Sequence, residues 1–396
     1  MNIQIRSEIH AIKDIIVSTR RDIHQHPELA FDEHRTSKLV AERLESFGIE
    51  IQTGVGKTGV VGTLKGKNDG KTIAFRADMD ALPIQETSDI SYKSKNDGIM
   101  HACGHDGHTA MLLGTAEALS KQADKLNGTL KFFFQPAEEG QGGARFMIDD
   151  GALEGVDEVY GIHLWNYQKY GTIGVKSGPI MAAADIFEIT VHGKGGHGAA
   201  PQGTKDAVLI AAHLIQTLQT IVSRNTNPIE STVVTVGQIN GGYNFNIIAD
   251  KVTLRGTTRA YTEDNRQLIK KRMKEIIAGT EKTFGTKIEL DYEDGYPPTV
   301  NDPTAADNLL NAAQKIVGDG AGNPYLSMGA EDFSYFLQKV PGCYFLVGSA
   351  PKDREPLSVP HHCSHFDIDE RALLIGSSVY LQLVDDLLIS EKINKD

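Results

Sequence analysis

Residues 100–108 concentrate groups that can bind metal, with one thiol and three imidazoles in nine positions. A cysteine thiolate and a neutral histidine are the ligands that borderline-soft divalent metals prefer. Cys103 and His105 are two residues apart, so on an extended strand end both side chains lean to the same side. An apolar run at 110–118 follows, which places the cluster at an element boundary, where catalytic groups are common. The alternative is a buried cysteine among scattered surface histidines, and ligands from other segments would argue against it.

A pair of adjacent carboxylates follows the next apolar segment. Residues 131–136 form an apolar run that stops at a proline, which is typical of a buried strand, and Glu138 and Glu139 come directly after it. One carboxylate could bind a metal while the other, its pKa raised by burial, acts as a general base. The competing interpretation is a solvated turn with two surface charges, which a buried strand pointing the pair outward disfavours.

Two further segments carry histidines. His163 lies inside an apolar strand predicted at 159–164, where a lone histidine is more often a satisfied core residue than a ligand. Residues 360–367 hold three histidines and Cys363. Either segment alone is ambiguous, so whether these histidines bind metal depends on which other candidate ligands lie near them in the fold.

Length and charge restrict the class of protein. A chain of 396 residues exceeds the size at which one core keeps growing, so we expect two domains. A net charge of −12 offers no basic surface for nucleic acid. The N-terminus lacks the pattern of a signal peptide, and no run approaches the roughly 20 apolar residues of a membrane span. Three cysteines are too few for a disulfide framework, so we expect a cytoplasmic protein.

The pattern of elements predicts an α/β sheet covered by helices. Two helices are expected within 8–47, broken at His26 and Pro27, and another after Gly107. A strongly apolar final helix is expected at 370–390. Strands are predicted at 59–64, 72–77, 130–134 and 159–164.

Residues 185–293 follow a different pattern. Half-exposed strands are expected at 185–191, 231–238, 252–259 and 287–292. Helices at 206–223 and 262–283 separate them, in the order β-α-β-β-α-β of a ferredoxin-like domain. We therefore predict an α/β protein of two domains. Residues 1–184 and 296–396 form one sheet-and-helix domain, and 185–295 form an inserted ferredoxin-like α+β domain.

The motifs together resemble those of a known family. They are Met-His-Ala-Cys-Gly-His-Asp-Gly-His at 100–108, Gln-Pro-Ala-Glu-Glu-Gly at 135–140, Gly-Lys-Gly-Gly-His at 193–197, Gly-Thr-Thr-Arg at 256–259 and Met-Gly-Ala-Glu-Asp-Phe at 328–333. In this order they resemble the amidohydrolase branch of the aminoacylase and carboxypeptidase metallopeptidase family. That branch includes hippurate hydrolases, N-acetyl-amino-acid deacetylases and indole-acetyl-amino-acid hydrolases.

The resemblance implies a metal site in the sheet-and-helix domain, which would be the catalytic domain. The positions that match the family's metal ligands are Cys103, His105, Glu139, His163 and His362. Five ligands exceed one tetrahedral zinc site, so two divalent ions per subunit, zinc or manganese, are expected. Glu138 matches the general base, which takes a proton from the metal-activated water and returns it to the leaving nitrogen. The residues after His362 depart from the family pattern, which leaves His361 as a rival ligand.

The resemblance also assigns roles to the inserted domain, which would be a lid and a dimerisation domain. His197 would stabilise the oxyanion, in its own subunit or in a neighbour's site. Arg259 would clamp a substrate carboxylate, and Asn246 and Glu331 match further substrate contacts. Taken singly, His197 could be an exposed loop histidine and Glu331 an ordinary acid at a helix N-terminus.

We therefore expect a metal-dependent amidohydrolase that cleaves the amide bond of N-acyl amino acids, of acetyl or benzoyl type, with a metal-activated water. The alternatives are a dipeptidase or carboxypeptidase with the same dinuclear site, and a non-catalytic metal-binding regulatory protein. The last is disfavoured because the base and all five ligand positions are intact. The expected partner is the small-molecule substrate rather than nucleic acid or a membrane, and the expected assembly is a homodimer or higher oligomer through the inserted domain.

Overall fold

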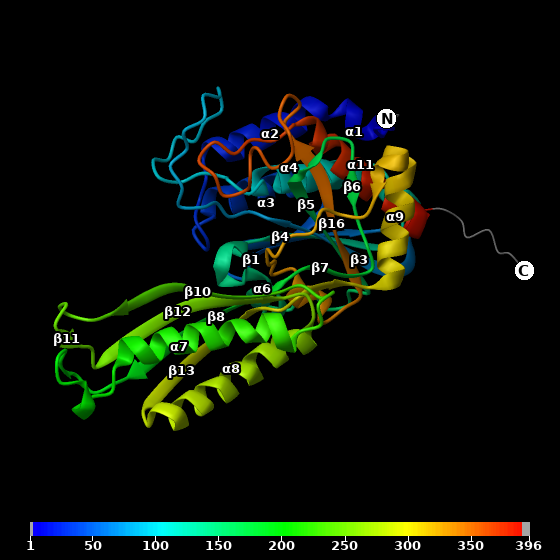
Figure 1. Cartoon of the computed structure of the whole chain (residues 1–396). Helices are drawn as coiled ribbons and strands as arrows, with labels where there is room; N and C mark the ends of the chain where they lie inside the picture. The colour runs from blue at the N-terminus through cyan, green and yellow to red at the C-terminus, as the bar shows by residue number, and fades with distance from the viewer. Residues whose placement is uncertain (1–2, 390–396) are drawn as a thin grey trace, which may run out of the picture. The chain divides into compact units, whose positions relative to one another are not determined.

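The computed structural model describes residues 3–389, which divide into two compact units (Figure 1). The first unit comprises residues 3–180, 300–326 and 332–389. The second comprises residues 181–299 together with the short segment 327–331. The chain thus leaves the first unit, builds the second and returns. The assignment of catalytic and lid roles to such units stays a prediction.

A mixed sheet forms the centre of the first unit. Its strands are β1 (Glu50–Val55), β2 (Gly59–Lys65), β3 (Asn68–Asp78), β4 (Asn127–Gln135), β5 (Glu158–Lys169), β6 (Ile173–Gly174), β15 (Ala321–Gly322) and β16 (Gly342–Ala350). Over residues 3–389 these eight strands lie in the order β1-β2-β4-β3-β5-β16-β6-β15. The neighbours β4, β3, β5 and β16 run parallel. Their carboxyl ends therefore meet at one edge, where ligand sites of α/β sheets form.

Helices cover this sheet, which explains why its central strands are apolar throughout. They are α1 (Ser7–Ala11), α2 (Lys13–Gln25), α3 (His34–Ser46), α4 (His105–Ser120), α5 (Glu138–Gln141), α6 (Gly143–Asp149), α9 (Pro303–Val317), α10 (Ser334–Leu337) and α11 (Arg371–Val384). Helix α4 is buried along almost its whole length, between β3 and the helices α2 and α11. A helix that is apolar on every side can be stable only in such a position.

The second unit has the ferredoxin-like arrangement that the sequence predicts. Its main strands and helices are β8 (Ala183–His192), α7 (Ala207–Thr220), β10 (Thr232–Gly241), β12 (Lys251–Ala260), α8 (Glu263–Phe284) and β13 (Lys287–Tyr296). Within residues 181–299 these four strands form an antiparallel sheet in the order β10-β12-β8-β13. Phe187, Ile189 and Val191 alternate with exposed or half-exposed residues along β8 and belong to one core with buried residues of α7 and α8. The predicted fold class is confirmed.

Several elements differ from the prediction. Strand β1, strand β16 and helix α9 are not predicted from the sequence. The final helix begins at Arg371 and continues as a π-helical segment to Ile389. The last residue predicted for it, Ser390, lies outside the described residues.

Two helical segments are long and apolar enough to cross a membrane, Ala207–Asn225 and Arg371–Ile389, although none is expected from the sequence. Each buries an apolar side in the core of its own unit. In α7 this side includes Ile210, Leu214 and Leu218. A core helix meets the same criteria of length and composition, so these segments are weak indications of a membrane span.

Candidate metal and catalytic site

The Cys103 and His105 side chains are set by a turn. The extended strand end expected from the sequence is wrong, because Gly104 has φ 98° and His105 begins helix α4. Glycine adopts this left-handed conformation without a steric penalty. The turn, rather than strand alternation, brings the sulfur of Cys103 and the imidazole of His105 to one place.

The five predicted ligands lie together in the first unit, in two groups that share Cys103. One group consists of Cys103, His105 and His163, and the other of Cys103, Glu139 and His362. Within each group the potential ligand atoms lie within 4.8 Å of one another. A thiolate shared by two such groups can bridge two cations, so the arrangement suits a dinuclear site.

Hydrogen bonds orient two of the imidazoles for ligation. His105 Nδ1 lies 2.9 Å from the backbone oxygen of Asp80, and His163 Nδ1 lies 2.5 Å from that of Leu164. A carbonyl oxygen only accepts, so each Nδ1 carries the proton and each Nε2 keeps a free lone pair. His163 Nε2 faces the Cys103 sulfur at 3.5 Å. This is the orientation that a metal-binding histidine needs.

The electrostatics of the cluster also fit a cation. His105 Nε2 and Glu139 Oε1 are buried and have no hydrogen-bond partner among residues 3–389. His362 Nε2 lies 3.1 Å from the same Glu139 oxygen without the geometry of a hydrogen bond. Contact with the Cys103 sulfur, and then with Glu139, raises the pKa of His362 to about 11. A site that holds a proton this strongly has an excess of negative charge, which divalent ions would neutralise.

The other two histidines are buried in the same cluster, and their charge states differ. Burial lowers the pKa of His163 well below its ordinary value, with help from His108 and His361, so its imidazole is neutral. Burial alone would lower the pKa of His105 too, but Asp78 and neighbouring acceptors outweigh it and raise that pKa. The acidic groups around His105 therefore favour a positive charge beside its Nε2, which a bound cation would supply.

The rival ligand His361 has a different environment. Its Nε2 accepts a hydrogen bond from the backbone N–H of Asn166 at 3.2 Å, and its protonated Nδ1 faces the Cys103 sulfur at 3.8 Å, so neither ring nitrogen keeps a lone pair free for a cation. Its ring packs against Trp165 and Phe366, with ring centroids 5.0 Å away in both cases. His362 instead has a left-handed backbone conformation itself (φ 63°), and its N–H donates to the Ala102 carbonyl oxygen. The geometry therefore favours His362 as the ligand.

The carboxylate pair follows β4 at a sharp turn. Ala137 is left-handed (φ 54°), and Glu138 and Glu139 come directly after it. Glu138 is buried and Glu139 is half-buried, so the solvated-turn alternative does not apply. Carboxylate oxygens of both residues lie within 4.8 Å of a ring nitrogen of His105. Glu138 is therefore close enough to the ligand cluster to exchange a proton with a water held there.

A buried support network behind the ligands is not predicted from the sequence. Asp78 accepts a hydrogen bond from His108 Nδ1 at 2.6 Å, and His108 Nε2 accepts one from the Leu164 N–H, beside His163. Arg76 is fully buried and donates to Asp78 at 2.6 Å. The available signal is the Asp-Met-Asp sequence at the carboxyl end of the predicted strand at 72–77, where functional side chains collect.

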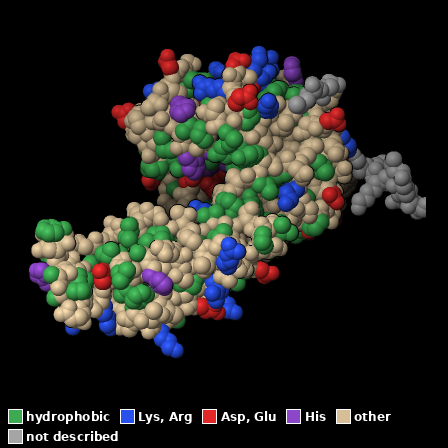
Figure 2. All heavy atoms as spheres, viewed as in Figure 1, with side chains coloured by type: hydrophobic (Ala, Val, Ile, Leu, Met, Phe, Trp, Pro, Cys, Tyr) green, Lys and Arg blue, Asp and Glu red, His purple; other side chains and the backbone are tan. Residues whose placement is uncertain are grey.

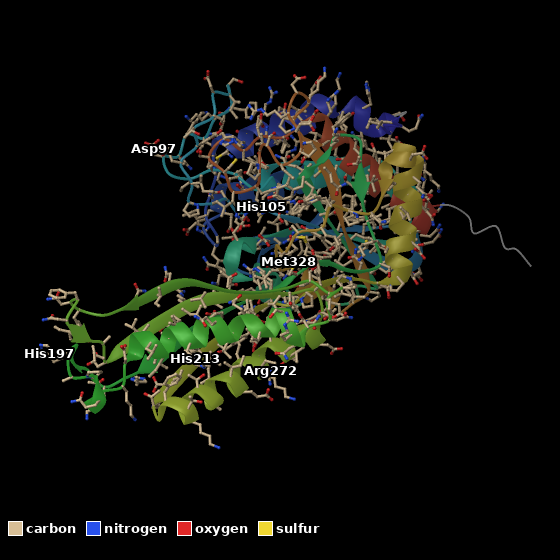
Figure 3. All side chains as sticks on the ribbon, in the orientation of Figure 1. Asp97, His105, His197, His213, Arg272 and Met328 are labelled. Atoms are coloured by element: carbon tan, nitrogen blue, oxygen red, sulfur yellow. The ribbon has the colours of Figure 1, made fainter. Side chains whose placement is uncertain are left out.

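The remaining predicted site residues belong to the second unit. His197 and Asn246 line one hollow, where β9 (Gly196–His197) pairs with β11 (Ile247–Ile248). Figure 3 shows His197 at the end of this unit. Arg259 lies on β12, half-buried, and has no hydrogen-bond or ion-pair partner among residues 3–389. Glu331 is buried in the segment 327–331.

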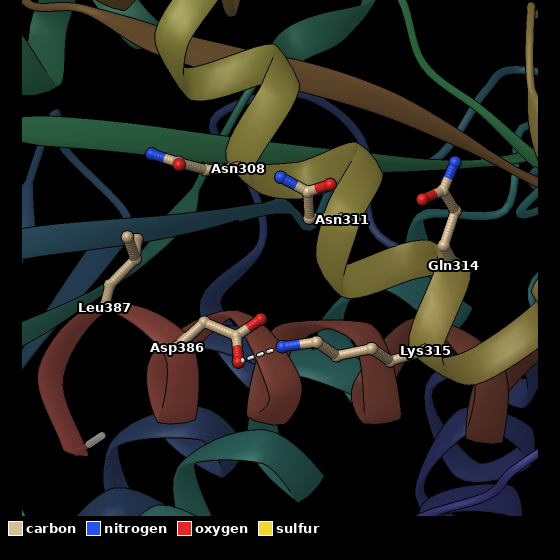
Figure 4. A pocket seen from close by; sticks show the side chains of 6 residues that line it. All are labelled: Asn308, Asn311, Gln314, Lys315, Asp386 and Leu387. Carbon is tan, nitrogen blue, oxygen red and sulfur yellow. Dashed lines mark hydrogen bonds and ion pairs between the residues drawn. The ribbon is translucent and has the colours of Figure 1, made fainter. Parts of the chain in front are cut away.

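A separate hollow of about 640 Å³ lies on the first unit beside helix α9 (Figure 4). Its lining includes Asn308, Asn311 and Gln314, and contains none of the predicted site residues. Lys315 and Asp386 pair with each other across it at 2.6 Å. Because these charges satisfy each other, we assign no chemistry to this hollow.

Comparison with known proteins identifies the family of this chain. The family model for peptidase family M20/M25/M40 matches residues 74–386. Thermostable carboxypeptidase 2 of Saccharolobus solfataricus is 43% identical over 384 residues, 96% of this chain and 97% of the relative. The N-acetyl-L-cysteine deacetylase of Bacillus subtilis is 40% identical over 380 residues, 96% of this chain and 90% of the relative. The solved structure of the YXEP protein of Bacillus subtilis, a dinuclear metal-binding peptidase, aligns with a TM-score of 0.84 at 36% identity, covering 96% and 99% of the two chains.

The fold and the ligand cluster, taken with these relatives, define a metal-dependent hydrolase of amide bonds. The chain belongs to peptidase family M20/M25/M40. The resemblance predicted from the sequence motifs is confirmed.

Proposed function

We propose that this protein hydrolyses the amide bond of N-acyl amino acids at a dinuclear metal site. The observation that carries the proposal is the pair of ligand groups sharing Cys103, with Glu138 beside them. Cys103, His105 and His163 would hold one ion, and Cys103, Glu139 and His362 the other. Thiolate and imidazole favour zinc, whereas the carboxylate also suits manganese.

Bound divalent ions would polarise the scissile carbonyl and lower the pKa of a water. Glu138 takes the proton of the attacking water and delivers it to the leaving nitrogen, as a buried carboxylate close to the cluster can. The Ala199 N–H donates to Nδ1 of His197 at 3.1 Å, so the ring proton lies on Nε2. From Nε2, His197 would donate a hydrogen bond to the oxyanion.

The acyl group and the amino acid are proposed from relatives. The deacetylase relative acts on an N-acetyl amino acid by name, whereas the carboxypeptidase relative favours a peptide as the second candidate substrate. Both substrate types present a free carboxylate, which the unpaired Arg259 would bind. The test is detection of free amino acid from N-acetyl, N-benzoyl and dipeptide substrates, with zinc, manganese and cobalt each supplied. Release from dipeptides alone would replace the first candidate by the second, and release from none would refute the proposal.

Arg259→Ala is expected to raise KM about 10- to 100-fold for substrates with a free carboxylate, because a hydrogen bond to a charged group contributes about 1.5–3 kcal/mol. The corresponding amides should be affected little. Arg255→Ala is the matched control, because Arg255 lies on the same strand, four residues before Arg259, and is exposed. Equal losses with acids and amides would contradict the carboxylate clamp.

We further propose a homodimer or higher oligomer formed through the second unit. Near His197 it exposes apolar side chains, including Phe245 at 96% and Tyr243 at 70% exposure. Figure 2 shows hydrophobic side chains on the surface at the end of this unit. Exposed apolar patches of this kind commonly mark protein interfaces. The compartment proposed is the cytoplasm, which suits the free thiols of Cys103, Cys343 and Cys363.

A dimer raises the question of whether His197 acts in its own subunit or in its partner. His197→Ala is expected to lower kcat about 10²- to 10³-fold, the usual effect of losing one oxyanion donor. Mixing His197→Ala with Glu138→Gln subunits should restore about a quarter of wild-type activity if His197 acts across the dimer, because half of the dimers then contain one complete site. No recovery after demonstrated subunit exchange would mean that each site is built from one chain.

A further inference from the structure

The turn that presents Glu138 is conformationally demanding. Ala137 precedes it with φ 54° and ψ 46°, a left-handed conformation that a residue with a Cβ adopts only against steric resistance. Gly143, at the end of the turn, passes so close to Pro136 that an added Cβ would lie 1.7 Å from its carbonyl oxygen. A backbone conformation of this kind persists only where its surroundings hold it.

Two buried carboxylates hold this turn, one on each side of Glu138. The Ala137 N–H donates to Glu33 Oε1 at 2.9 Å, and the Glu139 N–H donates to Asp80 Oδ2 at 2.9 Å. Asp80 also lies beside His105, so it belongs to the metal site. Glu33 is 104 residues away in sequence and contacts none of the five ligand candidates through a hydrogen bond or ion pair among residues 3–389.

Glu33 occupies a position where a side chain normally accepts hydrogen bonds from the first N–H groups of its own helix. It is the N-cap residue of α3, yet its side chain makes no capping hydrogen bond. Glu28 satisfies the free N–H groups of that helix instead, accepting from Arg35 at 2.7 Å and from Thr36 at 2.8 Å. The carboxylate of Glu33 is thereby available for Ala137, and its other oxygen accepts a hydrogen bond from Thr58 at 2.5 Å.

Burying this carboxylate is unfavourable. Glu33 is fully buried, and desolvation, with a smaller contribution from the Asp80 charge, raises its pKa to about 7. A carboxyl group in such a place would be replaced at little loss by an apolar residue if it only filled space. Its two hydrogen bonds point to a requirement for an acceptor at this position.

We infer that Glu33 is a positioning residue for Glu138: its carboxylate holds the Ala137 N–H and so fixes the turn that directs the Glu138 side chain at the ligand cluster. The inference rests on the proposed role of Glu138 as the general base. Glu33 itself touches neither substrate nor metal in this scheme. Any group that accepts the Ala137 N–H in the same place can replace it.

The experiment compares Glu33→Ala, Glu33→Gln and Glu28→Ala. Glu33→Ala is expected to lower kcat about 10²-fold, the effect of a misplacement of roughly 1 Å, with KM and metal content unchanged. Glu33→Gln should recover most of the rate, because its amide oxygen accepts the Ala137 N–H and its amide nitrogen can donate to Thr58. Glu28→Ala removes the cap of the same helix, so it should lower the melting temperature without changing kcat.

Hydrogen exchange of residues 136–143, measured by mass spectrometry, provides a readout independent of activity. Protection should fall in Glu33→Ala and remain in Glu33→Gln and Glu28→Ala. If Glu33→Ala does not fold, Thr58→Val replaces it, and a lower kcat at unchanged metal content is then the expected result. Unchanged kcat in Glu33→Ala or in its substitute Thr58→Val, or equal losses in Glu33→Ala and Glu33→Gln, would overturn the inference. An inactive wild type with the expected exchange pattern would instead refute the proposed function and leave the clamp on Ala137 intact.

Discussion

Glu138→Gln is expected to lower kcat by about 10²- to 10⁴-fold, the usual contribution of a positioned acid–base group. Gln keeps the size and the hydrogen-bonding oxygen of Glu138 but cannot accept a proton from water. KM should change little, because the lost interaction matters mainly in the transition state. The measurement is steady-state kinetics on an N-acyl amino acid that the wild type hydrolyses, together with elemental analysis of bound metal.

The matched control is the neighbouring residue. Glu139 joins the group formed with Cys103 and His362, so Glu139→Gln should lower metal content as well as rate. Glu138→Gln should keep full metal content. Normal turnover in Glu138→Gln, or metal loss equal to that of Glu139→Gln, would show that the two carboxylates do not divide their roles in this way.

The elements that could be predicted are those that local rules determine. The apolar alternation along β8 follows directly from its burial on one face. The start of α7 follows from Asp206, whose side chain accepts from the N–H groups of Val208 and Leu209, and Thr262 caps α8 in the same way. In these places the signal and its cause lie within a few residues of each other.

The elements that could not be predicted depend on contacts between distant residues. Strand β1 is largely exposed and has no apolar pattern, so only its pairing with β2 defines it. The strand end expected at Cys103 became a turn because Gly104 permits a left-handed backbone. The role of Glu33 cannot be predicted from the sequence. At the start of a helix it looks like an ordinary cap residue, and only the structure shows that it accepts a hydrogen bond from the Ala137 N–H.

In the candidate site too, local motifs can be predicted from the sequence, whereas contacts between distant residues cannot. The motifs around Cys103 and Glu138 identify ligand types, but not which of His361 and His362 has a ring nitrogen free to bind a cation. Both rings approach the Cys103 sulfur, and His361 differs because its Nε2 accepts a hydrogen bond from the Asn166 N–H. Asp78 and Asp80 are not predicted as site residues because carboxylates after a strand are common. Their role is identified only by the imidazoles of His108 and His105 that they contact.

Removal of divalent metal by a chelator is expected to abolish turnover and to lower the melting temperature. Ligands that bind only the folded state stabilise it by about 4 kcal/mol when present at 1,000 times their Kd. Without metal, only bound protons would offset the negative charge of the clustered thiol and carboxylates, which lie beside the imidazoles. Because the pKa of His362 is raised to about 11 by Cys103 and Glu139, a proton must leave when a metal binds. Metal affinity should therefore fall as the pH is lowered.

Cys103→Ala tests the shared thiolate directly. Since Cys103 belongs to both ligand groups, its loss should lower the metal content of both positions, whereas the loss of His163 should affect one. Cys363→Ala is the matched control, because Cys363 follows His362 in sequence but joins none of the ligand groups found among residues 3–389. Elemental analysis and calorimetry after dialysis against metal give the stoichiometry and the stability of each variant. Full occupancy of two ions in Cys103→Ala would mean that the sulfur does not bridge them, and the two groups would then have to be joined by another residue or by water.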